Sequence, residues 1–97
     1  MRIDFAPRAR IDLVQIGERS RNVFGAAVAA ALETYIRATV SRIAAMPESG
    51  QRVPERPAVR VVSLVRYPFR IFYTATPDKV TILHIRHTAR RPWQGEE

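Results

Sequence analysis

The chain has 97 residues, a formal net charge of +7 and no cysteine. This length fits one domain with a single two-layer core, and the lack of cysteine excludes disulfides and cysteine-ligated metal sites. The longest apolar stretch, residues 23–32, is about half as long as a membrane span, and the N-terminus lacks the apolar segment of a secretory signal. We therefore expect a cytoplasmic protein, with a single domain over residues 1–93 and a polar, disordered tail over residues 94–97.

The positive charge is concentrated in the second half of the chain. Residues 1–51 carry seven Arg and five acids, whereas residues 52–93 carry nine Arg or Lys against only Glu55 and Asp78. The balance is therefore +2 in the first segment and +7 in the second, and the two glutamates of the tail return −2. A basic half of this kind predicts a polyanionic partner, either nucleic acid or an acidic peptide.

The first two elements in chain order are a strand and a helix. Residues 2–5, RIDF, alternate polar and apolar side chains, which predicts a short strand. Pro7 is favoured in the first turn of a helix, and Asp12 lies off the apolar stripe of this helix. The stripe comprises Ala9, Leu13 and Ile16. Because Gly17 weakens the pattern, we expect the helix to end between residues 18 and 21.

A second, longer helix follows. Asn22 is a favourable N-cap, and Pro47 ends the helix because proline cannot continue the backbone hydrogen-bond ladder. One face carries apolar side chains at helical spacing: Phe24, Val28, Leu32, Tyr35 or Ile36, Val40 and Ile43. The short link between two amphipathic helices predicts an antiparallel helical hairpin.

The pattern then changes to that of strands. Residues 47–57 contain three prolines and one glycine, which predicts a loop. Three strand-like runs follow at residues 59–66, 69–75 and 80–86, and the short turns between them predict an antiparallel meander. Alternation in the middle strand places Phe69, Ile71 and Tyr73 on one face, and Arg70, Phe72 and Thr74 on the other.

The predicted order of elements is therefore β-α-α-β-β-β. Neither the helical hairpin nor the meander can bury its apolar face alone, so the two must pack on each other. We predict an α+β, two-layer domain in which the antiparallel helical hairpin packs on a small antiparallel sheet.

Four motifs occur in order along nearly the whole chain, from residue 3 to residue 92. They are the A-x-x-D-L-x-x-I pattern of the first helix, the helix exit "RIAAMPESGQR", the strand "YPFRIFY" and the last strand "VTILHIRHTARRP". Together they resemble the RelE/ParE superfamily of bacterial type II toxins, and within it the ParE branch. Two departures are "GQR" where the family has adjacent Gly and Arg, and the second basic residue of "ARRP", where ParE relatives often carry an acid.

This resemblance implies the RelE/ParE-like fold and a toxin that is neutralised by a cognate ParD-like antitoxin with an acidic C-terminal segment, in a hetero-oligomer. ParE-type relatives inhibit DNA gyrase, RelE-type relatives cleave mRNA on the ribosome, and the fold alone does not choose between them. We favour a gyrase inhibitor that acts by binding, with no catalytic residue, cofactor or metal. The chain has one lysine, Lys79, whereas ribosome-directed relatives hold ribosomal RNA with several.

The alternative is a ribosome-dependent mRNA endoribonuclease. Such an enzyme needs a proton acceptor, a proton donor and cations around the reacting phosphate. By the resemblance, Arg70 matches an Arg that contacts the phosphate, and Glu55 lies in the loop where some relatives carry a catalytic acid. His87, near the end of the last strand, is the candidate proton donor. Each residue also has a structural interpretation: Arg70 as a cross-strand partner, Glu55 as a solvated loop residue and His87 as a hydrogen-bond partner of a loop. We expect His84 to be buried and satisfied, and no metal site, because His84 and His87 face opposite sides of a strand.

The basic end of the sheet is the predicted binding surface. We expect it to contact an acidic protein segment of the antitoxin or of gyrase, with no contact to membranes and no direct binding of DNA by the toxin alone, since no aromatic and basic stacking motif is present. The residues assigned to this surface are Arg60, Arg66, Arg70, Arg86, His87, Arg90, Arg91 and Trp93. We also expect the Ala-rich helices to leave an apolar groove for a helical antitoxin segment.

Overall fold

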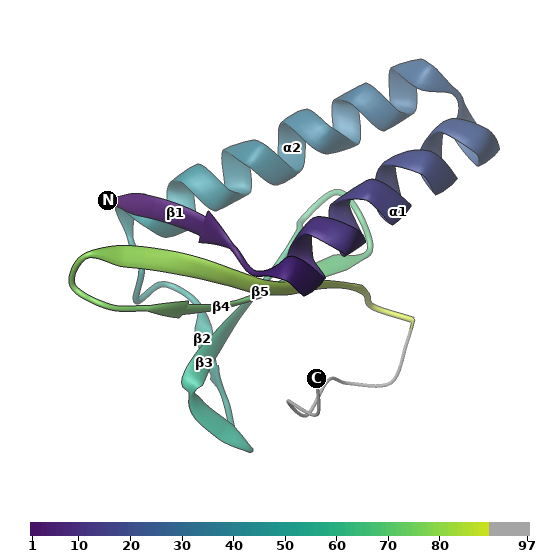
Figure 1. Cartoon of the computed structure of the whole chain (residues 1–97). Helices are drawn as coiled ribbons and strands as arrows, with labels where there is room; N and C mark the ends of the chain where they lie inside the picture. The colour runs from purple at the N-terminus through teal and green to yellow at the C-terminus, as the bar shows by residue number, and fades with distance from the viewer. Residues whose placement is uncertain (90–97) are drawn as a thin grey trace.

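Two antiparallel helices pack on one face of a five-stranded sheet in the computed structural model (Figure 1). The elements are β1 (Arg2–Phe5), α1 (Pro7–Phe24), α2 (Ala26–Ala45), β2 (Gln51–Val53), β3 (Arg56–Ser63), β4 (Phe69–Ala75) and β5 (Lys79–His87). The structure describes residues 1–89. The expectations for Arg90, Arg91, Trp93 and the tail at residues 94–97 lie outside this range.

The order of strands in the sheet is β1-β5-β4-β3-β2. Strands β2 to β5 are antiparallel neighbours, which confirms the predicted meander, and β1 joins β5 as a parallel edge strand. The β4–β5 register places one extra residue, Leu83, in β5, since Tyr73 pairs with Ile82 while Phe72 pairs with His84. Such a bulge bends the strand and redirects the side chains that follow it.

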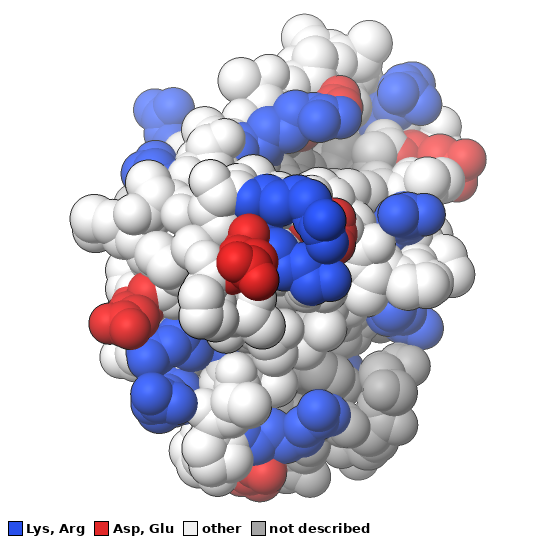
Figure 2. All heavy atoms as spheres, turned by 60° about the vertical axis from the view of Figure 1, so that its left-hand side comes forward, with Lys and Arg blue, Asp and Glu red and all other residues white. Residues whose placement is uncertain are grey.

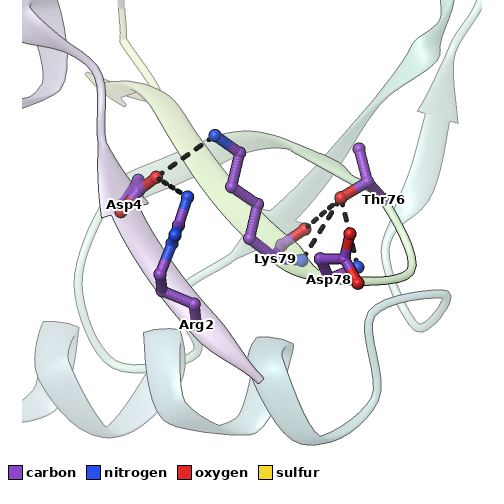
Figure 3. A network of polar contacts seen from close by, with 5 residues as sticks. All are labelled: Arg2, Asp4, Thr76, Asp78 and Lys79. Carbon is purple, nitrogen blue, oxygen red and sulfur yellow. Dashed lines mark hydrogen bonds and ion pairs between the residues drawn. The ribbon is translucent and has the colours of Figure 1, made fainter.

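An ion pair between Asp4 and Lys79 links the edge strand β1 to the start of β5 (Figure 3). The carboxylate of Asp4 accepts from Arg2 and from the Nζ of Lys79, each at 3.3 Å. The hydrogen bond from Lys79 is the main reason that the pKa of Asp4 lies below its usual value. Charged residues on an edge strand also discourage pairing with the sheet of another molecule.

The core lies between the helices and the sheet, as the periodicity predicted. Ile71 and Tyr73 of β4 are fully buried on the helical side. The other face of the sheet carries a small second cluster of Val53, Val59 and Phe72. The predicted division of β4 into two faces is therefore confirmed, and so is the α+β fold class.

The first helix is longer than the sequence indicated. It continues to Phe24, so Asn22 lies inside α1 and does not cap α2. The chain breaks instead at Gly25, whose φ of 93° is a left-handed conformation that favours glycine. Glycine within a helix costs only about 1 kcal/mol relative to alanine, so Gly17 does not end α1. Phe24, which ends α1, and Val28 of α2 are exposed, so the apolar stripe predicted for the second helix does not include them in the core.

The segment at residues 47–57 is not only a loop. Gln51–Val53 forms β2, and β3 begins at Arg56 and ends at Ser63, rather than spanning residues 59–66. Burial of Val53 against Val59 and Phe72 explains why this proline-rich segment forms a hairpin. Pro57 is tolerated because β4 pairs with β3 only from Arg60 onward.

The hydroxyl of Tyr73 fixes the exit of α2 to the sheet. It donates to the carbonyl of Pro47 at 2.8 Å and accepts from the backbone N–H of Gly50 at 3.0 Å. The guanidinium of Arg60 donates to the carbonyls of Glu48 and Gly50 at 3.1 and 2.8 Å. The loop after α2 is therefore held by β3 and β4 together.

Candidate functional site

A row of polar side chains crosses three strands at the basic end of the sheet. Ser63 of β3 is opposite Arg70 of β4, and Arg70 is opposite Arg86 of β5. Residues opposite each other in a sheet point to the same face, and like charges in this arrangement repel. Arg70 forms no ion pair or hydrogen bond within residues 1–89. Arg70 therefore presents a cationic group that favours an anionic contact on this face.

A pocket of about 550 Å³ lies beside this row, between the β2–β3 hairpin and β4. Arg70, Arg52, Glu55 and Phe72 are among the residues that line it. Arg52 donates through its Nη1 to the carbonyl of Pro57 at 2.8 Å, which gives this guanidinium a role within the hairpin. Glu55 is exposed in the hairpin turn. Two of the three candidate catalytic residues thus share one pocket.

The third candidate, His87, lies on the other face of the sheet. It pairs with Phe69, and the two rings make an edge-to-face contact with centroids 5.3 Å apart. Phe69 packs against the core on the helical side, whereas Arg70 faces away from it. The Nδ1 of His87 accepts from the backbone N–H of Ala89 at 3.0 Å. The expected hydrogen bond to the following loop is therefore present, and the fold does not bring His87 together with Glu55.

The other arginines assigned to the binding surface differ in their roles. Arg60 is half-buried, and its guanidinium stabilises the loop after α2 through hydrogen bonds to backbone carbonyls. Arg66 is exposed in the turn between β3 and β4. Arg86 is half-buried beside Arg70. Figure 2 shows basic side chains at several places on one face of the molecule, and those at the centre of the view adjoin acidic side chains.

The expected groove is present between the two helices. It has a volume of about 730 Å³ and extends over about three turns of α1 and of α2. Leu13, Gly17 and Ala29 contribute to its apolar part, while Arg21 and Glu33 are among the charged residues that border it. An apolar groove with charged borders is typical of a binding site for an amphipathic helix.

Sequence reasoning placed Asp12 off the apolar stripe, but its carboxylate is buried. It contacts the Nδ1 of His84 and accepts from the backbone N–H of Ile85 at 2.9 Å and from the Nε of Arg8 at 3.2 Å. Burial raises the pKa of Asp12, but the hydrogen bonds from His84 and Ile85 and the attraction of His84 and Arg8 outweigh burial, so the pKa lies below its ordinary value. The prediction of a buried, satisfied His84 is confirmed. The motif position of Asp12 was the only signal of this contact in the sequence.

Within residues 1–89, no three His, Asp or Glu side chains gather as a metal site would require. In the same part of the chain, no helix is long and apolar enough to cross a membrane.

A helical hairpin packed on a five-stranded sheet is the fold that this chain shares with solved ParE and RelE toxin structures. The chain matches the family described as "ParE toxin of type II toxin-antitoxin system, parDE" over residues 3–92. It therefore belongs to the ParE toxin family, and the expected RelE/ParE membership is confirmed. Comparison with curated proteins gave no match.

Solved structures of toxins from type II systems share the fold, among them three from P. aeruginosa and E. coli. A chain of the chromosomal ParDE system from P. aeruginosa has a TM-score of 0.77 and 24% identity, covering 90% of this chain and 95% of that one. The isolated E. coli RelE toxin has a TM-score of 0.60 and 16% identity, covering 92% and 85%. A chain of the E. coli RelBE complex has a TM-score of 0.61 and 16% identity, covering 93% and 98%. At these identities the likeness concerns the fold.

Proposed function

We propose that this ParE-family toxin acts in the cytoplasm by binding and inhibiting DNA gyrase, without cleaving RNA and without binding DNA on its own. The observation that carries the proposal is the separation of the candidate catalytic groups. Arg70 and Glu55 line one pocket, whereas His87 packs on Phe69 across the sheet. Proton transfer requires a donor within hydrogen-bond reach of the reacting atom, and this arrangement supports binding rather than catalysis.

We also propose that a ParD-like antitoxin neutralises the toxin in a hetero-oligomeric complex. The family match and the two neighbours that come from toxin–antitoxin systems support an antitoxin partner. The groove between α1 and α2 would hold a helical segment of this antitoxin, and an acidic extended segment would reach the cationic row at Arg70 and Arg86.

The alternative activity, ribosome-dependent cleavage of mRNA, retains one favourable observation. Arg70 and Glu55 share the pocket of the outer face, which could hold a phosphate close to an acid. A nuclease on this face would have to recruit its proton donor from residues other than His87, or from the ribosome.

Two assays on the same purified toxin separate these activities. In the first, the toxin is added to DNA gyrase and relaxed plasmid, and supercoiling is followed. In the second, it is added to ribosomes programmed with mRNA, and cleavage is mapped by primer extension. We expect supercoiling to be inhibited and the mRNA to remain intact. Cleavage of ribosome-bound mRNA, with gyrase unaffected, would replace this proposal by the nuclease.

A further inference from the structure

Gly17 is a glycine inside a helix, and no close contact within residues 1–89 requires a glycine there. It lies inside α1, where glycine weakens a helix relative to alanine. A Cβ built at this position meets no atom within 4 Å, so packing inside the described chain does not require its absence. By contrast, Gly50 has the Tyr73 hydroxyl 2.7 Å from such a Cβ. The space above Gly17 opens into the groove between the helices.

The position of Gly17 in that groove is central. Arg10 and Arg21 lie seven residues before it and four residues after it, on the same side of α1. Ala26 and Ala30 line the groove from α2. Because Gly17 has no side chain and the space above it is open, the backbone of a third helix can approach α1 closely at this point.

The two borders of the groove differ in charge. On α2, Glu33 and Arg37 satisfy each other, with Arg37 Nη2 and Glu33 Oε2 3.0 Å apart. On α1, neither Arg10 nor Arg21 forms an ion pair within residues 1–89, and neither does Glu18 between them. The α1 border therefore carries a net charge of +1 from three unpaired groups, whereas the α2 border is neutral.

We propose that Gly17 is the close-contact point at which an amphipathic antitoxin helix crosses α1, and that this helix directs its acidic side chains to Arg10 and Arg21 of the α1 border. The proposal rests on the antitoxin complex proposed above. Arg10 and Arg21 are eleven residues apart, or about 16 Å along a helix. A partner helix that lies along the groove would therefore carry acids about three turns apart on one side, with small or flat apolar residues between them opposite Gly17.

The first test is a graded series, Gly17→Ala and Gly17→Leu. The probe is the purified protein encoded by the reading frame next to the toxin gene, with binding measured by calorimetry. Gly17→Ala should raise the melting temperature of the toxin alone by about 4–8 °C and weaken binding about tenfold, and Gly17→Leu should weaken it further. Ala38→Leu, at an exposed position of α2 outside the groove, is the control and should leave affinity unchanged.

The second test uses charge. Arg10→Glu with Arg21→Glu should weaken binding several-fold and make it less sensitive to salt. The paired exchange Glu33→Arg with Arg37→Glu keeps the ion pair of the α2 border and should have no such effect. Equal losses in both double variants would overturn the assignment of the acids to the α1 border.

The outcomes separate this inference from the proposed complex. If the wild-type toxin does not bind the neighbouring protein at all, the proposed antitoxin fails. If the wild type binds and both Gly17 variants bind equally well, only the close contact is wrong. If Gly17→Leu changes the oligomeric state of the toxin alone, a second copy of this chain occupies the groove, and the inference is overturned.

Discussion

The carboxylate of Asp12 on α1 contacts the imidazole of His84 on β5, 72 positions away in the sequence, and both side chains are buried. The parallel pairing of β1 with β5 stops at Ile82. Beyond that point, Asp12 takes the place of β1 as an acceptor for β5, through the N–H of Ile85. One carboxylate therefore closes the open edge of β5 and fixes α1 to it.

Removing this carboxylate should destabilise the fold strongly. Asp12→Ala leaves a buried imidazole and a buried N–H without their partner, and breaking a buried pair in this way costs about 3–5 kcal/mol. The free energy of unfolding, measured by urea denaturation of the purified toxin, should fall by that amount. The control is Glu33→Ala, which removes the exposed ion pair between Glu33 and Arg37 and should change the free energy of unfolding by less than about 0.5 kcal/mol. This pair has the same i,i+4 spacing as Arg8 and Asp12. Similar effects of both variants would show that the Asp12 contact contributes little.

The contacts of the Asp12 carboxylate also predict how the stability of the fold depends on pH. Because the pKa of Asp12 is lowered in the folded protein, its stabilising contribution is complete above the pKa of an ordinary Asp and is lost as the pH falls through the folded pKa. As the pH is lowered from neutral into the acid range, unfolding free energies should decline more steeply for the wild type than for Asp12→Asn. The two curves should converge at the acidic end, and parallel curves would contradict this.

Local signals were sufficient for most of the fold. The predicted strand at residues 69–75 is β4, and Pro7 begins α1, because alternation and proline preference act over a few residues. The strand β2 was missed since Val53 becomes buried only through the distant Phe72. The burial of Asp12 could not be predicted either, because it depends on a partner that the sheet brings to α1.

In the candidate site, too, local sequence signals predicted some features but not those that depend on the pairing of strands. The sequence indicated that Arg70 lies on the outer face of β4 and that basic residues gather near the end of β5. It did not place His87, because the bulge at Leu83 changes the alternation of β5 before that residue is reached. Only the register with Phe69 assigns His87 to the helical side. The separation of the candidate catalytic residues is therefore a property of the folded sheet.

Gly50 should be intolerant of any side chain. A Cβ there would lie 2.7 Å from the Tyr73 hydroxyl and 3.0 Å from the carbonyl oxygen of Val61. Gly50→Ala should therefore lower the unfolding free energy by about 1–3 kcal/mol. Tyr73→Phe should have an effect of similar size, because it leaves the buried N–H of Gly50 without an acceptor. Gly17→Ala is the matched control, and it should increase stability.

Substitutions of Arg60 and Arg66 should differ in their effects on the stability of the toxin and on its binding to the antitoxin. Arg60→Ala removes two bonds to backbone carbonyls, so it should lower the melting temperature as well as weaken the complex with the antitoxin. Arg66→Glu changes an exposed charge, so it should leave the melting temperature within about 2 °C while weakening the complex at low salt. If Arg66→Glu binds as well as the wild type at low salt, the turn between β3 and β4 is not part of the interface.

His87→Gln gives the sharpest distinction between binding and catalysis. Glutamine retains a polar side chain of similar reach but cannot act as an acid or base near neutral pH. If the toxin acts by binding, this variant should still arrest growth, and cells should filament while translation continues. Arg70→Ala should weaken gyrase inhibition by losing a contact, without changing its pH dependence. A general acid would instead lose about 10²-fold or more in rate on replacement by glutamine. Loss of mRNA cleavage in both variants, in a system where the wild type cleaves, would establish the nuclease and exclude the binding mechanism.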